Sequence, residues 1–215
     1  MSIASWKGLV SARKAYSMLV EALRRSPERH QSVELPQPKG DLAVENIYYA
    51  PQGIQKSILK GVSFGLRPGD SVGVIGPSAA GKSTLAKLLV AVWQASAGTV
   101  RLDGGDVYTW NRDNFGKHVG YLPQDVELFR GSVLENIARM DKEADTQKVI
   151  QAAQMAHVHD LILRLPNGYE TEIGIEGMSL SAGQRQRIAL ARAFYGDPKL
   201  VILDECDSMT NAAQF

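Results

Sequence analysis

A glycine-rich run with a lysine and a serine is the part of this sequence best suited to do chemistry. The run GPSAAGKST comprises Gly76, Pro77, Ser78, Ala79, Ala80, Gly81, Lys82, Ser83 and Thr84. Backbone N–H groups that point inward at the start of a helix bind phosphate, because they supply donors and a favourable dipole. In such a loop Lys82 would contact the β- and γ-phosphates, Ser83 would bind Mg²⁺ and Thr84 would contact the α-phosphate. A turn that only caps a helix is the alternative interpretation.

The residues on either side of this loop predict the strand and the helix that such a site needs. The stretch Ser71–Ile75 has the composition of a strand that runs into the loop. After the loop, apolar residues recur at helical spacing. They are Leu85, Leu88, Leu89, Val92 and Trp93.

Two adjacent carboxylates follow a second apolar run. Residues 200–203, LVIL, predict a strand of a parallel sheet that is buried on both faces, because such strands read as continuous apolar runs. Asp204 and Glu205 follow at its carboxyl end, where ligands bind in open α/β sheets. There Asp204 would hold Mg²⁺ through water and Glu205 would orient or deprotonate the attacking water. A solvated turn is the alternative for the two acids taken alone.

Two further segments resemble one group of P-loop ATPases. Residues 180–205, LSAGQRQRIALARAFYGDPKLVILDE, resemble the signature segment of ABC-type ATPases, and YLPQD at residues 121–125 is similar to their Q-loop. The resemblance covers about residues 41–205. It implies an α/β P-loop NTPase core with an inserted helical subdomain at about residues 128–192. Helical periodicity at 132–140 and 145–165 agrees with that insertion.

The same resemblance assigns roles to the signature and to the Q-loop. Two copies of the domain would enclose ATP, with the signature residues of one copy closing over the phosphate loop of the other. These signature residues are Ser181, Ala182, Gly183 and Gln184. Gln124 would contact Mg²⁺ and the catalytic water. Ser181 precedes an amphipathic run, so its side chain is also expected to cap a helix N-terminus.

A third resemblance concerns the exporter subgroup. The segment from Ser5 to Arg25 carries apolar residues at helical spacing with interleaved Lys and Arg, which predicts an amphipathic helix. It is similar to the cytoplasmic end of the last membrane helix of an exporter, and a proline-containing linker follows up to residue 40. We therefore predict two parts, residues 1–40 and an ATP-binding domain at 41–215. A soluble helix or a helix lying on a membrane surface are alternatives.

Residues 59–110 and 118–140 resemble the protease, lipase and haem-carrier exporters of bacterial type I secretion. This resemblance implies a homodimer with a second ATP-binding domain, transmembrane domains, a periplasmic adaptor and an outer-membrane channel. The location implied is the cytoplasmic face of the bacterial inner membrane. A net charge of +1 provides no broad basic field for nucleic acid, so no nucleic-acid partner is expected. A soluble ABC ATPase acting on nucleic acid or ribosomes and an inert truncated remnant are the alternative interpretations.

The sequence departs from the family after Glu205. Residues 206–215, CDSMTNAAQF, match neither the family's leucine–aspartate loop nor its later histidine. We therefore interpret the chain as a truncated or frame-shifted piece of an exporter. The acidic strand is then expected to have one uncovered side with exposed apolar residues. Such a piece would bind ATP, hydrolyse it inefficiently and not transport by itself.

Ala182 provides the first testable prediction, because the family usually has glycine at this position. The methyl group adds bulk where backbone and phosphate meet and restricts the backbone. Ala182→Gly in an intact exporter is therefore expected to raise the steady-state ATPase rate by speeding nucleotide closure. An unchanged rate would show that the methyl group is harmless.

Overall fold

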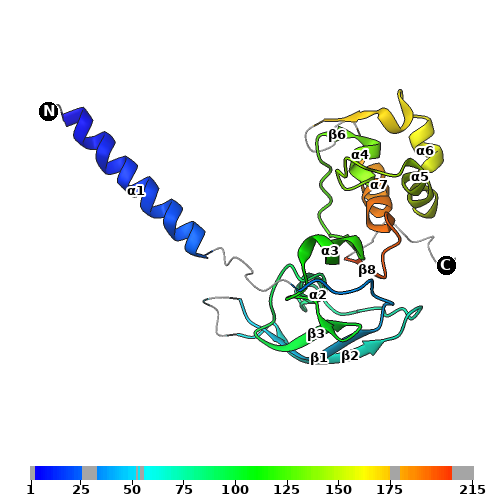
Figure 1. Ribbon diagram of the computed structural model, residues 1–215, viewed down its shortest axis with the longest axis horizontal. Coiled ribbons are helices and arrows are strands. Elements are labelled where there is room, and N and C mark those ends of the chain that lie inside the picture. Colours follow the sequence, from blue (N-terminus) through cyan, green and yellow to red (C-terminus); the bar gives the residue numbers. More distant parts are fainter. Residues whose placement is uncertain (1–2, 26–32, 52, 54–55, 175–179, 205–215) are drawn as a thin grey trace. The chain divides into compact units, whose positions relative to one another are not determined.

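The computed structural model describes residues 3–25, 33–51, 53, 56–174 and 180–204, and it divides into two compact units. The first unit, residues 1–32, contains α1 (Ile3–Arg25), a single helix where the sequence predicted one (Figure 1). Apolar side chains along it are exposed, among them Tyr16 at 69% and Leu19 at 58%. No helix in the described part of the chain combines the length and the apolar character needed to cross a membrane.

The second unit, residues 33–215, begins with a four-stranded antiparallel sheet of order β2-β1-β3-β4. Its strands are β1 (Leu42–Tyr49), β2 (Leu59–Leu66), β3 (Ala97–Leu102) and β4 (Gly105–Asp106). Apolar residues of β1 and β3 are buried in one cluster with Leu85, Leu88 and Leu89 of α2 (Lys82–Leu89). The helix predicted after the glycine-rich loop is thus present, but it ends before Val92 and Trp93.

A parallel pair of strands forms the second sheet of this unit. β5 (Val119–Leu122) pairs with β8 (Leu200–Leu203) in a register that matches Tyr121 with Ile202. Val119, Leu200 and Ile202 belong to the cluster that includes α2, whereas Leu122 belongs to a cluster that includes α7 (Ala182–Phe194). Side chains alternate between the two faces of a strand. α2 therefore packs on one face of the pair, and α7 packs on the other face, where it lies against β5.

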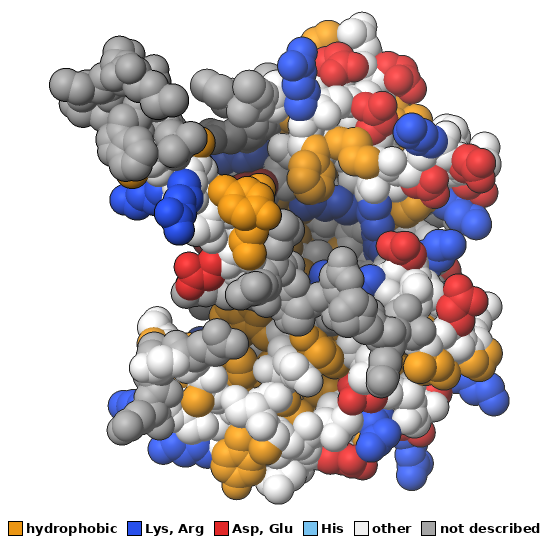
Figure 2. All heavy atoms as spheres, turned by 60° about the vertical axis from the view of Figure 1, so that its left-hand side comes forward, with side chains coloured by type: hydrophobic (Ala, Val, Ile, Leu, Met, Phe, Trp, Pro, Cys, Tyr) orange, Lys and Arg blue, Asp and Glu red, His pale blue; other side chains and the backbone are white. Residues whose placement is uncertain are grey.

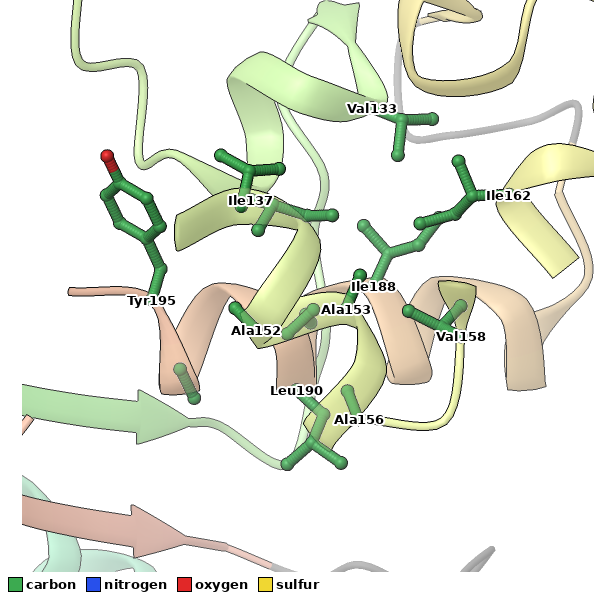
Figure 3. Close-up of a cluster of buried hydrophobic side chains, with 14 of the residues drawn as sticks. Val133, Ile137, Ala152, Ala153, Ala156, Val158, Ile162, Ile188, Leu190 and Tyr195 are labelled. Atoms are coloured by element: carbon green, nitrogen blue, oxygen red, sulfur yellow. The ribbon is translucent and has the colours of Figure 1, made fainter. Parts of the chain in front are cut away.

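The remaining elements form a helical part built around α7. They are β6 (Gly131–Ser132), α4 (Val133–Ile137), α5 (Thr146–Met155), α6 (His159–Leu163) and β7 (Glu172–Ile173). Their apolar side chains meet those of α7 in one buried cluster (Figure 3). Ile137, Ile162 and Ile188, one from each of three helices, are fully buried there. Periodicity predicted two helices, at residues 132–140 and 145–165. The structure has three shorter helices there, α4, α5 and α6.

Arg139 ties this helical part to the rest of the unit. Its guanidinium donates to the carbonyl oxygens of Arg192 (3.1 Å) and Ala193 (3.2 Å) at the end of α7. It also donates to the carbonyl oxygen of Gly116 (2.6 Å) in α3 (Arg112–Lys117). A cation at a helix C-terminus is favourable, because the last carbonyls lack helical partners. Burial lowers the pKa of Arg139, and the charge of Arg192 lowers it further.

The segment that leads into β1 is fixed to the β3–β4 hairpin by a second set of bonds. The carboxylate of Asp103 accepts the backbone N–H groups of Lys39 (2.6 Å), Gly40 (3.0 Å) and Asp41 (3.3 Å). Further back, Val33 pairs with Trp110 in a parallel bridge. Residues 33–41 are therefore an ordered part of the unit.

Acidic and basic side chains are interspersed over the face drawn in Figure 2.

Two strand predictions require correction. Residues 71–77 have no regular secondary structure, and Val72 and Val74 are 52% and 50% exposed, so the predicted strand Ser71–Ile75 is wrong for this structure. No described strand pairs with this stretch through backbone hydrogen bonds, and without such pairing an apolar run does not form a strand. β8 is not buried on both faces, since Val201 and Leu203 are 38% and 43% exposed. That exposure confirms the expected uncovered side.

The packing of β5 against α7 yields a stability prediction. A Cβ atom on Gly120 would overlap the carbonyl oxygen of Ala193, whereas one on Gly116 of α3 would meet nothing within 4 Å. Gly120→Ala is therefore expected to lower the free energy of unfolding by about 2–3 kcal/mol through overpacking. The matched control Gly116→Ala is expected to raise it by about 0.5–1 kcal/mol, because alanine favours a helix. Urea titrations of the two variants should thus shift in opposite directions.

Candidate nucleotide-binding site

The glycine-rich loop enters α2 through a left-handed residue. Gly81 is the N-cap of α2, with φ of 97°. A Cβ atom there would lie 3.0 Å from side-chain carbons of both Ile58 and Leu59. Glycine is needed at this position for its conformation and for the missing side chain. Ala79, two residues earlier, also has positive φ, at 63°, so the loop turns sharply before the helix begins.

Lys82 folds back over the loop that precedes it. Its ammonium group donates to the carbonyl oxygens of Gly76 (3.0 Å) and Pro77 (3.2 Å). These bonds hold the positive charge beside the backbone of the loop, which is where the sequence places phosphate. A phosphate bound in the loop would offer charged oxygens to the same ammonium, and bonds to charged acceptors are stronger than bonds to carbonyls.

Ser83 and Asp204 meet at the start of α2 although 121 residues separate them. The hydroxyl of Ser83 donates to Oδ1 of Asp204 at 3.0 Å. The backbone N–H of Asp204 donates to the carbonyl oxygen of Leu122 at 2.9 Å, which continues the β5–β8 ladder by one bond. Asp204 is only 6% exposed and forms no ion pair with a described residue. A hydroxyl and an uncompensated carboxylate provide the oxygen ligands that Mg²⁺ prefers.

The hydroxyl of Tyr121 is a buried polar atom close to this pair. It has no hydrogen-bond partner in the described part of the chain. Burial raises the pKa of Tyr121, and the negative charge of Asp204 raises it further, so the hydroxyl keeps its proton at neutral pH. Sequence reasoning placed Tyr121 at the start of the Q-loop segment but assigned it no role. The signal available was its alternation with Gly120 and Leu122, which places Tyr121 on the face of β5 opposite to α7.

Gln124 leaves the sheet at the same edge as Asp204. It follows β5 after Pro123 and is exposed. Since β5 and β8 are parallel and end together, the two chains turn away from the sheet side by side. The fold therefore brings the Q-loop to the edge that carries Asp204. The catalytic residue predicted next to Asp204, Glu205, lies outside the described residues.

The signature residues form the start of α7. Ser181 is the N-cap, and its hydroxyl accepts the backbone N–H of Gln184 at 3.2 Å while the Gln184 side chain accepts the N–H of Ser181 at 2.8 Å. This capping box confirms the predicted helix start. Ser181, Ala182 and Gly183 are exposed. No described hydrogen bond or ion pair joins them to the phosphate loop of their own chain.

Tyr49 of β1 and Trp93, which follows the C-terminal end of α2, make a contact that the sequence did not predict. The rings of Tyr49 and Trp93 stack with centroids 5.2 Å apart, and the ammonium of Lys87 lies 4.6 Å from the centroid of Trp93.

An open cavity of about 250 Å³ lies between α2 and β8, with Lys82 and Asp204 in its lining. Its other walls are mainly apolar, and Val72 and Val74 contribute to them.

Residues 59–208 match the ABC transporter family. The chain belongs to this family. The matched residues contain the phosphate loop, the Q-loop, the signature and Asp204, so the resemblance drawn from those motifs is confirmed. The family binds nucleotide through this domain, and the α/β P-loop fold expected from the sequence is confirmed as well.

Two curated relatives come from bacterial secretion systems. The type I secretion system ATP-binding protein PrsD of Rhizobium meliloti is 52% identical over 212 residues, which cover 99% of this chain and 36% of that protein. The leukotoxin translocation ATP-binding protein LktB of Mannheimia haemolytica is 37% identical over 204 residues, which cover 94% of this chain and 29% of that protein. The chain thus spans about a third of the length of these relatives.

A solved structure shows the same fold. The structure of a bacterial Atm1-family ABC exporter with ATP bound superposes with a TM-score of 0.75 at 30% sequence identity. The match covers 93% of this chain and 36% of that exporter. The arrangement of strands and helices described above is therefore that of an ABC exporter's ATP-binding domain.

The left-handed conformation of Gly81 gives a prediction about nucleotide affinity. Gly81→Ala places a methyl group against Ile58 and Leu59 at a backbone conformation that alanine rarely adopts. We expect the affinity for ATP, measured by titration with a fluorescent ATP analogue, to fall by about tenfold or more. The control Gly73→Ala, where a Cβ atom meets nothing within 4 Å, should bind as the wild type does. Equal affinities for the two variants would contradict the assigned loop geometry.

Proposed function

We propose that this chain is the ATP-binding part of a bacterial exporter that powers type I protein secretion. The observation that carries the proposal is the 3.0 Å hydrogen bond from Ser83 to Asp204, because it joins the two oxygen ligands that an Mg²⁺–ATP site requires. The secretion role is supported by the 52% identity to PrsD over almost the whole chain. The net charge of +1 provides no broad basic field, which fits an ATP-driven protein better than one that binds nucleic acid.

In this proposal each element of the site acts on a different part of ATP. The loop N–H groups and Lys82 bind the β- and γ-phosphates, and Thr84 contacts the α-phosphate. Ser83, Asp204 and Gln124 would hold Mg²⁺, which when bound spreads the charge that develops on the phosphates. Glu205 would orient the attacking water and accept its proton. The bonds from Lys82 to Gly76 and Pro77 would be exchanged for bonds to phosphate oxygens.

A second copy would complete the site. The N-terminus of α7, which Ser181 caps, is exposed and forms no described hydrogen bond with its own phosphate loop, so it is available to the nucleotide on another copy. We further propose that the complex includes transmembrane domains of the exporter, a periplasmic adaptor and an outer-membrane channel. The working location would be the cytoplasmic face of the inner membrane. The domain division at residue 40 and the helical subdomain at about 128–192 belong to the same proposal.

Nucleotide binding by two lysine variants tests the proposal. Lys82→Ala removes the ammonium that would contact phosphate, so ATP affinity in the presence of Mg²⁺ is expected to fall by about tenfold or more. The matched control Lys87→Ala removes a lysine five residues later in α2 that contacts Trp93 and has no described hydrogen bond to a loop carbonyl, and it should keep at least half of the wild-type affinity. Isothermal titration calorimetry measures both. The proposal would be overturned if the wild-type chain bound no ATP in the presence of Mg²⁺.

A further inference from the structure

We propose that Tyr121 is a further positioning residue of the Mg²⁺–nucleotide site, whose hydroxyl orients the water through which Asp204 holds the cation. The inference rests on the proposed function and adds a residue to it. Tyr121 is neither part of the phosphate loop nor one of the acids. It is placed instead by the strand that leads into the Q-loop.

Strand geometry puts Tyr121 on the correct face. Tyr121 is paired with Ile202 in the parallel ladder, and Asp204 comes two residues after Ile202. Paired residues in a parallel ladder project to the same face, and so do residues two apart in a strand. Ile202 packs in the cluster that contains α2, whereas Leu122 packs with α7 on the other face. Tyr121 and Asp204 therefore project toward α2, which begins at the phosphate loop.

The hydroxyl of Tyr121 and the carboxylate of Asp204 both have hydrogen-bonding capacity that no described residue uses. The Tyr121 hydroxyl is shielded from solvent and has no partner among the described residues. Asp204 is 6% exposed, and its carboxylate accepts one described bond, from Ser83. A carboxylate can accept about four hydrogen bonds. An unpaired buried donor near an under-used buried acceptor is the arrangement that an ordered water or a hydrated ion satisfies.

The chemistry of the site explains why the hydroxyl would be needed when the cation is bound. Ser83 would then direct an oxygen lone pair toward the cation, and its proton would remain donated to Asp204 as it is in this structure. The rest of the Asp204 carboxylate would accept from the water that lies between it and the cation. A neutral phenol that donates to the remaining lone pair of that water orients the water without adding charge. Phenylalanine would fill the same space but supply no donor.

A purely structural role for Tyr121 makes the opposite prediction for one substitution. If the ring only packs, Tyr121→Phe should be harmless or stabilising, because an unpaired buried hydroxyl costs free energy. If the hydroxyl orients the metal-bound water, the same variant should fold as well as the wild type but bind the metal less tightly. The two readouts separate the two roles.

The experiment uses the 215-residue chain with a nucleotide that is not hydrolysed. The dissociation constant of ADP is measured in the presence of a chelator and at saturating Mg²⁺, and the ratio gives the gain that the metal provides. Mn²⁺ is then bound in place of Mg²⁺ with ADP, and its affinity is followed by electron paramagnetic resonance. Urea unfolding of each variant reports the fold.

For Tyr121→Phe we expect the Mn²⁺ affinity of the nucleotide complex to fall by about tenfold, the equivalent of one hydrogen bond to a charged site. ADP affinity in the chelator should stay within about twofold of the wild type, because the hydroxyl does not contact the nucleotide. The matched control is Tyr169→Phe, which removes a hydroxyl bonded to His159 at 2.9 Å in the helical part. It should leave both affinities unchanged.

Unchanged Mn²⁺ affinity in Tyr121→Phe would overturn the inference while leaving the proposed function intact. An equal loss of ADP affinity with and without metal would also overturn it, since that pattern indicates altered packing. Failure of the wild-type chain to bind ADP under either condition is a separate outcome and would count against the proposed function itself.

Discussion

The parallel pairing of β5 with β8 is the interaction on which the rest of the site depends. It joins two segments that are about 80 residues apart, and its two faces carry α2 and α7. One face thus supports the helix that begins at the phosphate loop, and the other supports the helix that begins at the signature. The same pairing ends both strands at one edge, where Gln124 and Asp204 leave the sheet. Gly120 permits the close approach of α7 to this pair.

Lys82 and Ser83 form hydrogen bonds within the site that hold both side chains in place before a nucleotide binds. Lys82 donates to two loop carbonyls, and Ser83 donates to Asp204. Each bond keeps a charged or hydroxyl group close to where it would act, so little rearrangement is needed. Binding would exchange the carbonyl acceptors of Lys82 for phosphate oxygens and would add the cation beside Ser83 and Asp204. The carboxylate of Asp204 is buried and has no basic partner among the described residues, so it favours the binding of a cation.

The motifs allowed the phosphate loop, the start of α7 and the edge position of Asp204 to be predicted, because each depends on local residue types at fixed spacing. Ser71–Ile75 could not be judged in that way, since a strand needs a neighbour and local sequence does not specify one. Periodicity also joined α5 and α6 into one long helix, but His157 has a positive φ of 51° and breaks it. The unpaired hydroxyl of Tyr121 depends on contacts from two distant strands, which no local pattern reveals.

The attachment of residues 33–41 to the β3–β4 hairpin has a mechanical meaning. Asp103 binds three successive backbone N–H groups of this segment, and Val33 forms a further bridge with Trp110. A force applied to the chain ahead of Val33 would be resisted by all of these hydrogen bonds together. It would not be absorbed by the extension of a flexible linker. The tension would pass into the hairpin and, through β3 and β1, into the sheet beneath α2. Residues 33–41 are therefore a rigid connection, through which a movement of the β3–β4 hairpin would be transmitted to the chain ahead of Val33.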